Sequence, residues 1–167
     1  MRKAQGSGFH VETFGVCMFT AYLDQLHLYL YGTPITTFSF NESLLFGTTQ
    51  AGLTISVIYL ATLYILDMRK TPLNIPTIIP AAHNLFLTLL SLVLFIWMNE
   101  NAVTQLLDKG LFYSVCDYRS YTPRVEFIMY LNYLTKYYEL IDTLFLVLKK
   151  KKLEFLHVYH HSIHLIT

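Results

Sequence analysis

The sequence has few charged residues, and those it has are unevenly spread. Only 14% of its 167 residues are Asp, Glu, Lys or Arg, whereas 54% are hydrophobic. A soluble domain carries about 25% charged residues, so the deficit argues against a soluble protein. Long uncharged runs alternate with short charged segments, which is the pattern of a polytopic membrane protein.

The chain also lacks a large excess of one charge sign and any cysteine framework. Its net charge is +1, so no basic tail or stripe indicates a nucleic-acid partner. Cys17 and Cys116 are far apart and form no CxxC or zinc spacing. No small-x-small cleavage site follows the short apolar run at 14–23, which disfavours a signal peptide. Instead, we expect residues 14–31 to lie along the membrane surface.

Three segments are long enough to cross the hydrocarbon core as helices. Leu44–Leu66 has 23 residues without a charge, and Ile78–Met98 has 21; about 20 residues are needed. Val125–Leu148 is 24 residues long, although it carries four charged residues, which are Glu126, Lys136, Glu139 and Asp142. A fourth apolar segment starts at Leu153, and no helix stop signal follows it. We therefore expect that helix to continue beyond Thr167.

The joints between these spans predict the orientation of the chain. Prolines at 72, 76 and 80 are expected to keep the first joint non-helical. The joints after the first and third spans hold six of the twelve Lys and Arg residues, whereas the 26-residue loop expected at 99–124 holds three. The positive-inside rule then places both joints in the cytosol. We expect residues 1–43 to form a luminal N-terminal segment with an interfacial helix, and residues 44–167 a transmembrane core that is incomplete at its C-terminus.

Ionisable side chains in the third span point to function, because each costs several kcal/mol in a membrane unless it is paired or hydrated. Positions 136, 139 and 143 share one helical face, with 142 beside them. These residues are Lys136, Glu139, Thr143 and Asp142. A buried salt bridge that fixes helix packing is the alternative interpretation, but buried ion pairs are poor stabilisers.

Four histidines form a stripe at the start of the fourth segment: His157, His160, His161 and His164. A lone histidine on an apolar face is usually a core residue, but four in eight positions on one face are not. The lysine turn joins this stripe to the carboxylate face by a short hairpin, so we expect both to border one cavity. In the second span, interhelical hydrogen bonding is the favoured role of a smaller polar set: His83, Asn84, Thr88 and Ser91.

These two polar faces carry a family resemblance. Residues 132–143, NYLTKYYELIDT, resemble the KxxExxDT motif of the ELO family of very-long-chain fatty acid elongases, and His157–His161 resembles its HxxHH box. Weaker similarities are Tyr31-Gly32-Thr33-Pro34 and His83-Asn84. The resemblance implies an all-α bundle of seven transmembrane helices, of which this chain would supply the first three to four. It also implies a multi-pass protein of the endoplasmic reticulum membrane, for which the positive-inside rule gives a luminal N-terminus.

The resemblance further implies an acyltransferase, a 3-ketoacyl-CoA synthase. It would condense long-chain acyl-CoA with malonyl-CoA in the first step of fatty acid elongation, without a metal or other cofactor. Both cysteines fall on the far side by the charge rule, so a histidine would replace the usual thiol nucleophile. His160 is our candidate for it, with His157 and His161 orienting it or stabilising an enolate.

Other side chains would assist that chemistry. Glu139 or Asp142 would hold a histidine tautomer, and Lys136 would hold a carboxylate or a CoA phosphate. The remaining candidates would bind substrate, with the lysines taking CoA phosphates; they are Asn132, Thr143, Lys149, Lys150, Lys151 and Lys152.

The implied partners are the lipid bilayer, acyl-CoA, malonyl-CoA and other enzymes of the elongation cycle; a homo-oligomer is left open. One alternative is a di-iron membrane desaturase or hydroxylase, which also uses HxxHH but needs around eight ligands. This chain has seven histidines, and His10 and His27 lie outside the spans. Another alternative is an inactive truncated elongase that acts only as an interaction partner. Because the family's second histidine-tyrosine motif does not occur in the sequence, we expect this polypeptide alone to be inactive.

Overall fold

The computed structural model describes residues 17–165, and within them it contains helices and no strand. In chain order the elements are α1 (Cys17–Tyr31), the 3-10 turn η1 (Ile35–Thr37), α2 (Thr49–Asp67), α3 (Ile78–Cys116), the 3-10 turn η2 (Tyr118–Ser120), α4 (Pro123–Leu148) and α5 (Phe155–Ile163). The predicted all-α fold class is confirmed.

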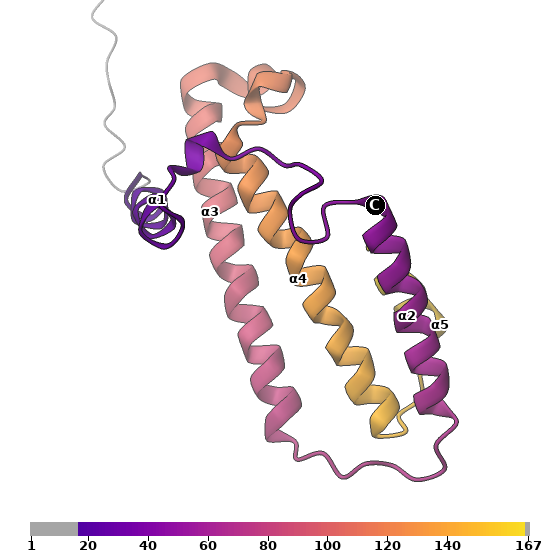
Figure 1. The fold of residues 1–167 in the computed structure, drawn as a ribbon. Coiled ribbons are helices and arrows are strands. Elements are labelled where there is room, and N and C mark those ends of the chain that lie inside the picture. Colours follow the sequence, from indigo (N-terminus) through magenta and orange to yellow (C-terminus); the bar gives the residue numbers. More distant parts are fainter. Residues whose placement is uncertain (1–16, 166–167) are drawn as a thin grey trace, which may run out of the picture.

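The four helices α2 to α5 alternate in direction (Figure 1). The joints 68–77 and 149–154 lie at one end of the bundle, which we call the lysine end. The turns η1 and η2 lie at the opposite end, the far end. α4 runs between α2 and α3 and also contacts α5. α1 is seen nearly end on in Figure 1, so it crosses the far end instead of running parallel to the long helices.

The first span is shorter than the sequence predicted, because helix α2 begins at Thr49 and not at Leu44. The Thr48 side chain caps it by accepting from the backbone N–H of Ala51. Residues 44–47 instead form a turn that α4 holds through two tyrosine hydroxyls, which donate to the carbonyls of Leu45 and Phe46. Gly47 is required in this turn, since a Cβ there would lie 2.6 Å from the Asn41 carbonyl oxygen.

The predicted loop at 99–124 is wrong for most of its length. α3 continues past Met98 to Cys116 and is interrupted only at Gly110, whose φ of 82° breaks the helix. Asn99 and Asn101 donate to the carbonyls of Phe95 and Trp97 on their own helix, which lets polar residues extend it beyond the apolar run. Beyond the helix, hydrogen bonds from Arg119 hold the pKa of the Asp117 carboxyl below its usual value.

The proline prediction for the first joint also needs a correction. Pro72 and Pro76 lie in the non-helical joint, but Pro80 lies inside the first turn of α3. It is tolerated there because the first N–H groups of a helix have no intrahelical partner.

Among the described residues, α2 and α3 are the helices long and apolar enough to cross a membrane. α4 confirms the third predicted helix and is long enough at 26 residues, with Thr122 as its N-cap. Its charged residues keep it from meeting the same criterion of composition. α4 lies between α2 and α3, parallel to α2 and antiparallel to α3 (Figure 1), so it runs along the same axis of the bundle as the spanning helices.

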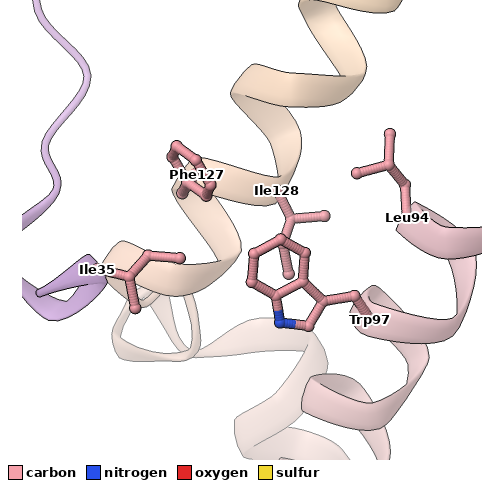
Figure 2. Packing of buried hydrophobic residues seen from close by; sticks show 5 residues of the cluster. All are labelled: Ile35, Leu94, Trp97, Phe127 and Ile128. Atoms are coloured by element: carbon pink, nitrogen blue, oxygen red, sulfur yellow. The ribbon is translucent and has the colours of Figure 1, made fainter. Parts of the chain in front are cut away.

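The far end is held together by an apolar cluster. Trp97 and Leu94 of α3 pack against Phe127 and Ile128 of α4, and Ile35 of η1 closes the cluster from the side (Figure 2). All five side chains are at most 8% exposed. Each large side chain buried in this way contributes about 1.5–3 kcal/mol relative to exposure.

α1 is bound to this end by polar contacts and by Phe19 and Leu23, which pack against the apolar cluster. Thr20 donates its backbone N–H and hydroxyl to Glu100 of α3, at 2.9 and 2.7 Å. Asp24, one turn on, accepts from the Arg124 guanidinium at the start of α4. Exposed tyrosines and a leucine cover much of the outward face of α1, including Tyr22, Leu28 and Tyr29. This orientation is the one that an interfacial helix requires.

Candidate functional site

The α4–α5 hairpin brings the two sequence motifs into contact. The Thr143 hydroxyl lies 3.1 Å from Nε2 of His157, and Thr143 is completely buried. The reversal between the helices is tight because Lys150 adopts a φ of 53°, in the left-handed region. The first joint closes beneath it, where the Leu73 N–H donates to the Leu148 carbonyl at 2.8 Å. Thr143, proposed from sequence as a substrate ligand, is therefore positioned to orient His157.

The charged residues of α4 divide into two pairs. Lys136 Nζ lies 3.0 Å from Glu139 Oε1, one helical turn away on the same face. Asp142 Oδ1 lies 3.1 Å from Nε2 of His83, which comes from α3. The nearest basic partner of Asp142 is thus a histidine of another helix and not one of the α5 stripe. The Lys136–Glu139 ion pair lowers the cost of placing these two charges within a span.

His83 is the site residue to which sequence reasoning gave too little weight. It is buried, and its ring packs against Tyr138 at 4.6 Å and Phe145 at 5.5 Å between centroids. Asn84, grouped with it from the sequence, is exposed and accepts a hydrogen bond from Thr88 of its own helix through its backbone carbonyl. Among the described residues, no interhelical hydrogen bond is found for Asn84 or Thr88, whereas His83 meets Asp142 of α4. The available signal was that His83 is the one ionisable residue in the run 78–98.

The histidine stripe on α5 forms as predicted. Ring centroids of His157 and His161 lie 4.6 Å apart, and those of His160 and His164 lie 4.3 Å apart. His157 and His161 are half-buried, with His161 within electrostatic range of Glu139 and Lys136. His160 is exposed, and in the part of the chain that the structure describes no hydrogen bond holds its ring.

A buried tyrosine, Tyr59 of α2, completes this region, and the sequence gave no sign of it. It is 5% exposed. Its hydroxyl faces Thr143 without a hydrogen bond of good geometry to any described residue. α2 thus contributes a polar atom to the wall of the site.

The predicted substrate ligands are spread more widely. Asn132 lies exposed at the other end of the motif. Lys151 and Lys152 are exposed at the lysine end. Lys150 instead turns to the last carbonyls of α2, donating to Leu66 and Asp67 and pairing with the Asp67 carboxylate at 3.3 Å. It binds the negative end of the α2 dipole, so its ammonium is already engaged.

The remaining histidines do not join the site. His27 lies at the far end, where its ring packs on Phe127, roughly 22 Å along α4 from Asp142 at 1.5 Å per residue. His10 lies outside the described residues. Within residues 17–165, no three His, Cys, Asp or Glu side chains are grouped as the ligands of a metal ion.

Comparison with known proteins gives the family. Residues 44–167 match the profile of the ELO: GNS1/SUR4 family. The chain is 53% identical over 81 residues, 48% of its length, to "Putative fatty acid elongase 1" of Schizosaccharomyces pombe. It is 43% identical over 81 residues, 47% of its length, to "Fatty acid elongase sre1" of Dictyostelium discoideum. It is 51% identical over 57 residues, 34% of its length, to "Very long chain fatty acid elongase 6" of Mus musculus.

The matched segments cover 24%, 30% and 21% of those three relatives' own lengths. No solved structure matches the chain. Since the family profile covers well over half of the chain, and both polar motifs fall inside the matched range, the chain belongs to the ELO family and is a multi-pass membrane protein.

Proposed function

We propose that this chain carries part of the active site of a 3-ketoacyl-CoA synthase, an acyltransferase of fatty acid elongation. The observation that carries the proposal is the contact between Thr143 and His157. It joins the carboxylate face of α4 to the histidine stripe of α5, at a depth where polar groups are costly without a use. The relatives support the same role, since their names are those of fatty acid elongases.

The proposed reaction proceeds in two steps. A ring nitrogen of His160 attacks the acyl thioester, forming an acyl-imidazole and releasing CoA as the thiolate, which takes up a proton. Malonyl-CoA then loses carbon dioxide, and the resulting enolate attacks the acyl-imidazole. A carbon–carbon bond forms, the carbon–nitrogen bond breaks, and the histidine is regenerated. His160 suits the first step because its ring is exposed and free of hydrogen bonds to the described residues.

The neighbouring groups would orient the histidine rings and balance the charge that develops on them. Thr143 holds His157 through Nε2, which fixes the ring relative to His160 and His161. Asp142 faces His83 and also interacts electrostatically with His157, so it supports the positive charge that a histidine gains during catalysis. In this proposal Lys151 and Lys152 take the phosphates of CoA, whereas Lys150 stays with α2.

The cellular setting forms part of the proposal. The lysine end faces the cytosol, and the far end faces the lumen of the endoplasmic reticulum. Other enzymes of the elongation cycle take up the product on the cytosolic side, where the proposed site opens. Membership of the ELO family goes against the desaturase alternative. The interaction-only alternative predicts no chemistry in the full-length protein, and the following experiment distinguishes it.

The experiment uses the full-length protein in detergent or nanodiscs. With acyl-CoA alone, one equivalent of free CoA should appear, and steady-state rates with both substrates should follow ping-pong kinetics. His160→Ala should abolish the release. His164→Ala is the matched control, since it removes an exposed imidazole one turn further along α5, and the release should be largely intact. Release of CoA only when malonyl-CoA is present would contradict the covalent route.

A further inference from the structure

A small polar pocket lies at the far end, away from the proposed active site. Its volume is about 130 Å³, and every side chain lining it is polar: Thr20, Glu100, Asn101, Thr104, Gln105, Thr122 and Arg124. Glu100 is 8% exposed. One of its oxygens accepts both hydrogen bonds from Thr20, whereas the other, Oε1, is buried without a hydrogen-bond partner among the described residues. The same holds for Gln105 Oε1.

The two unpartnered oxygens indicate the chemical nature of the group that would bind in the pocket. Both are acceptors, so the group that satisfies them is a donor, and the carboxylate favours a cation. Leaving such an acceptor unpaired costs about 1–3 kcal/mol, and more when it is charged. Arg124 lines the pocket, but its guanidinium donates to Asp24 through two nitrogens. A cationic donor from outside the described chain therefore fits this pocket.

An apolar groove adjoins the pocket. It has a volume of about 200 Å³ and lies between α1, α3 and α4, with Leu23, Leu30, Leu90, Val93 and Trp97 among its lining residues. On α1, the pocket residue Thr20 is three positions from Leu23. On α3, the groove residue Trp97 is three positions from Glu100. Residues three apart are neighbours on a helix surface, so the pocket and the groove meet within one turn of both helices.

The order of the two sites along α3 matches the depth profile of a bilayer. The groove is lined by residues of the apolar run that ends at Met98, and the pocket begins at Glu100. The run 78–98 is about 31 Å long at 1.5 Å per residue, close to the hydrocarbon thickness of about 30 Å. The polar pocket therefore lies at the level of the lipid headgroups and the groove at the level of the acyl chains.

We propose that this pocket and groove bind one membrane phospholipid with an ethanolamine headgroup. Its primary ammonium donates to Glu100 and Gln105, and one acyl chain occupies the groove beside Val93. Ethanolamine fits better than choline because a trimethylated nitrogen has no N–H to donate. The site is independent of the histidine chemistry proposed above, and its bound lipid fastens α1 to the rest of the bundle.

The test is native mass spectrometry of the full-length protein with lipids of identical acyl chains. The headgroups are ethanolamine and its mono-, di- and trimethylated forms. Wild-type protein should bind the ethanolamine lipid on the order of tenfold more tightly than the choline lipid, which corresponds to 1.4 kcal/mol. Glu100→Gln should remove this preference. Glu42→Gln, at an exposed position away from the pocket, should keep it.

Two further substitutions test whether an acyl chain occupies the groove. Val93 is 38% exposed and lines the groove, so Val93→Trp should fill it and weaken binding of every headgroup. Ile96→Trp, at a 43% exposed position on the same helix that does not line the groove, is the control. Equal binding of ethanolamine and choline lipids by the wild type would overturn the proposal without any variant. So would a photo-crosslinker at position 93 that captures polypeptide in place of lipid.

Discussion

The lysine end and the far end of this bundle are built in different ways. At the lysine end, the contact between Thr143 and His157 joins residues 14 positions apart, on two helices of one hairpin. At the far end, Thr20 binds Glu100 across 80 positions, and Asp24 binds Arg124 across 100. Local spacing encodes the first arrangement, whereas only the folded chain produces the second.

This difference separates two kinds of polar burial. The charges at the lysine end are grouped in one stretch, and some of their atoms stay exposed, as His160 does. The polar groups at the far end are dispersed in sequence and serve to attach α1. A group that is costly to bury and left accessible indicates chemistry, whereas the hydrogen bonds of Thr20 and Asp24 at the far end attach α1 to the bundle. The two ends should therefore respond differently to perturbation.

The largest expected contrast is topological. Single cysteines at Lys70, Lys151 and Asp108, in a full-length background lacking Cys17 and Cys116, should label from opposite sides of the membrane. Residues 70 and 151 should react from the cytosol, and residue 108 only after the lumen is opened, because the positive-inside bias favours that orientation. We choose position 108 because Gly110 has a φ of 82° that a cysteine would strain. Labelling of position 108 from the cytosol would reverse the assignment of the two ends.

The next contrast is catalytic. Thr143→Val keeps the shape of a completely buried side chain but removes the hydroxyl that meets His157. In the full-length protein, kcat should fall roughly 10- to 100-fold, with little change in KM, because an unpaired buried group costs about 1–3 kcal/mol. Thr54→Val is the control, since its exposed hydroxyl bonds only to its own helix. Equal kcat values in the two variants would show that the Thr143 hydroxyl does not contribute to catalysis.

The smallest contrast concerns stability. Thr20→Val deletes one of the two hydrogen bonds that Glu100 receives from α1. We expect a loss of about 1–2 kcal/mol in the free energy of unfolding, seen as a lower melting temperature by circular dichroism, with kcat per folded molecule unchanged. Thr62→Val removes an exposed hydroxyl bonded within α2 and should change stability by less than about 0.5 kcal/mol. A loss of kcat in Thr20→Val would mean that the far end takes part in catalysis.

The sequence predicted the lysine end of the molecule better than the far end. The long apolar runs identified the spanning helices, and the 3.6-residue period placed Lys136, Glu139 and Thr143 on one face. The joining of that face to His157 also followed, because a short hairpin leaves two helices little choice of neighbour. Long-range partners had no such signal: nothing in the sequence pairs Asp142 with His83 or Glu100 with Thr20.

The errors in helix boundaries have a common cause. Hydropathy marks where the membrane ends, but backbone hydrogen bonding decides where a helix ends. α3 therefore continues beyond the apolar run through residues that bond to their own helix, such as the buried Asn101. α2 starts late because α4 fixes the turn before it, through Tyr133 and the Phe46 carbonyl.

If a histidine of α5 carries the acyl group, a covalent acyl adduct should be detectable on that helix. The full-length protein is incubated with acyl-CoA alone, quenched and digested, and the peptide spanning His157 to His161 is analysed by mass spectrometry. We predict one added acyl mass on that peptide, located on His160, and its absence in His160→Ala. A wild-type peptide without the added mass, while condensation proceeds normally once malonyl-CoA is supplied, would exclude an acyl-histidine intermediate.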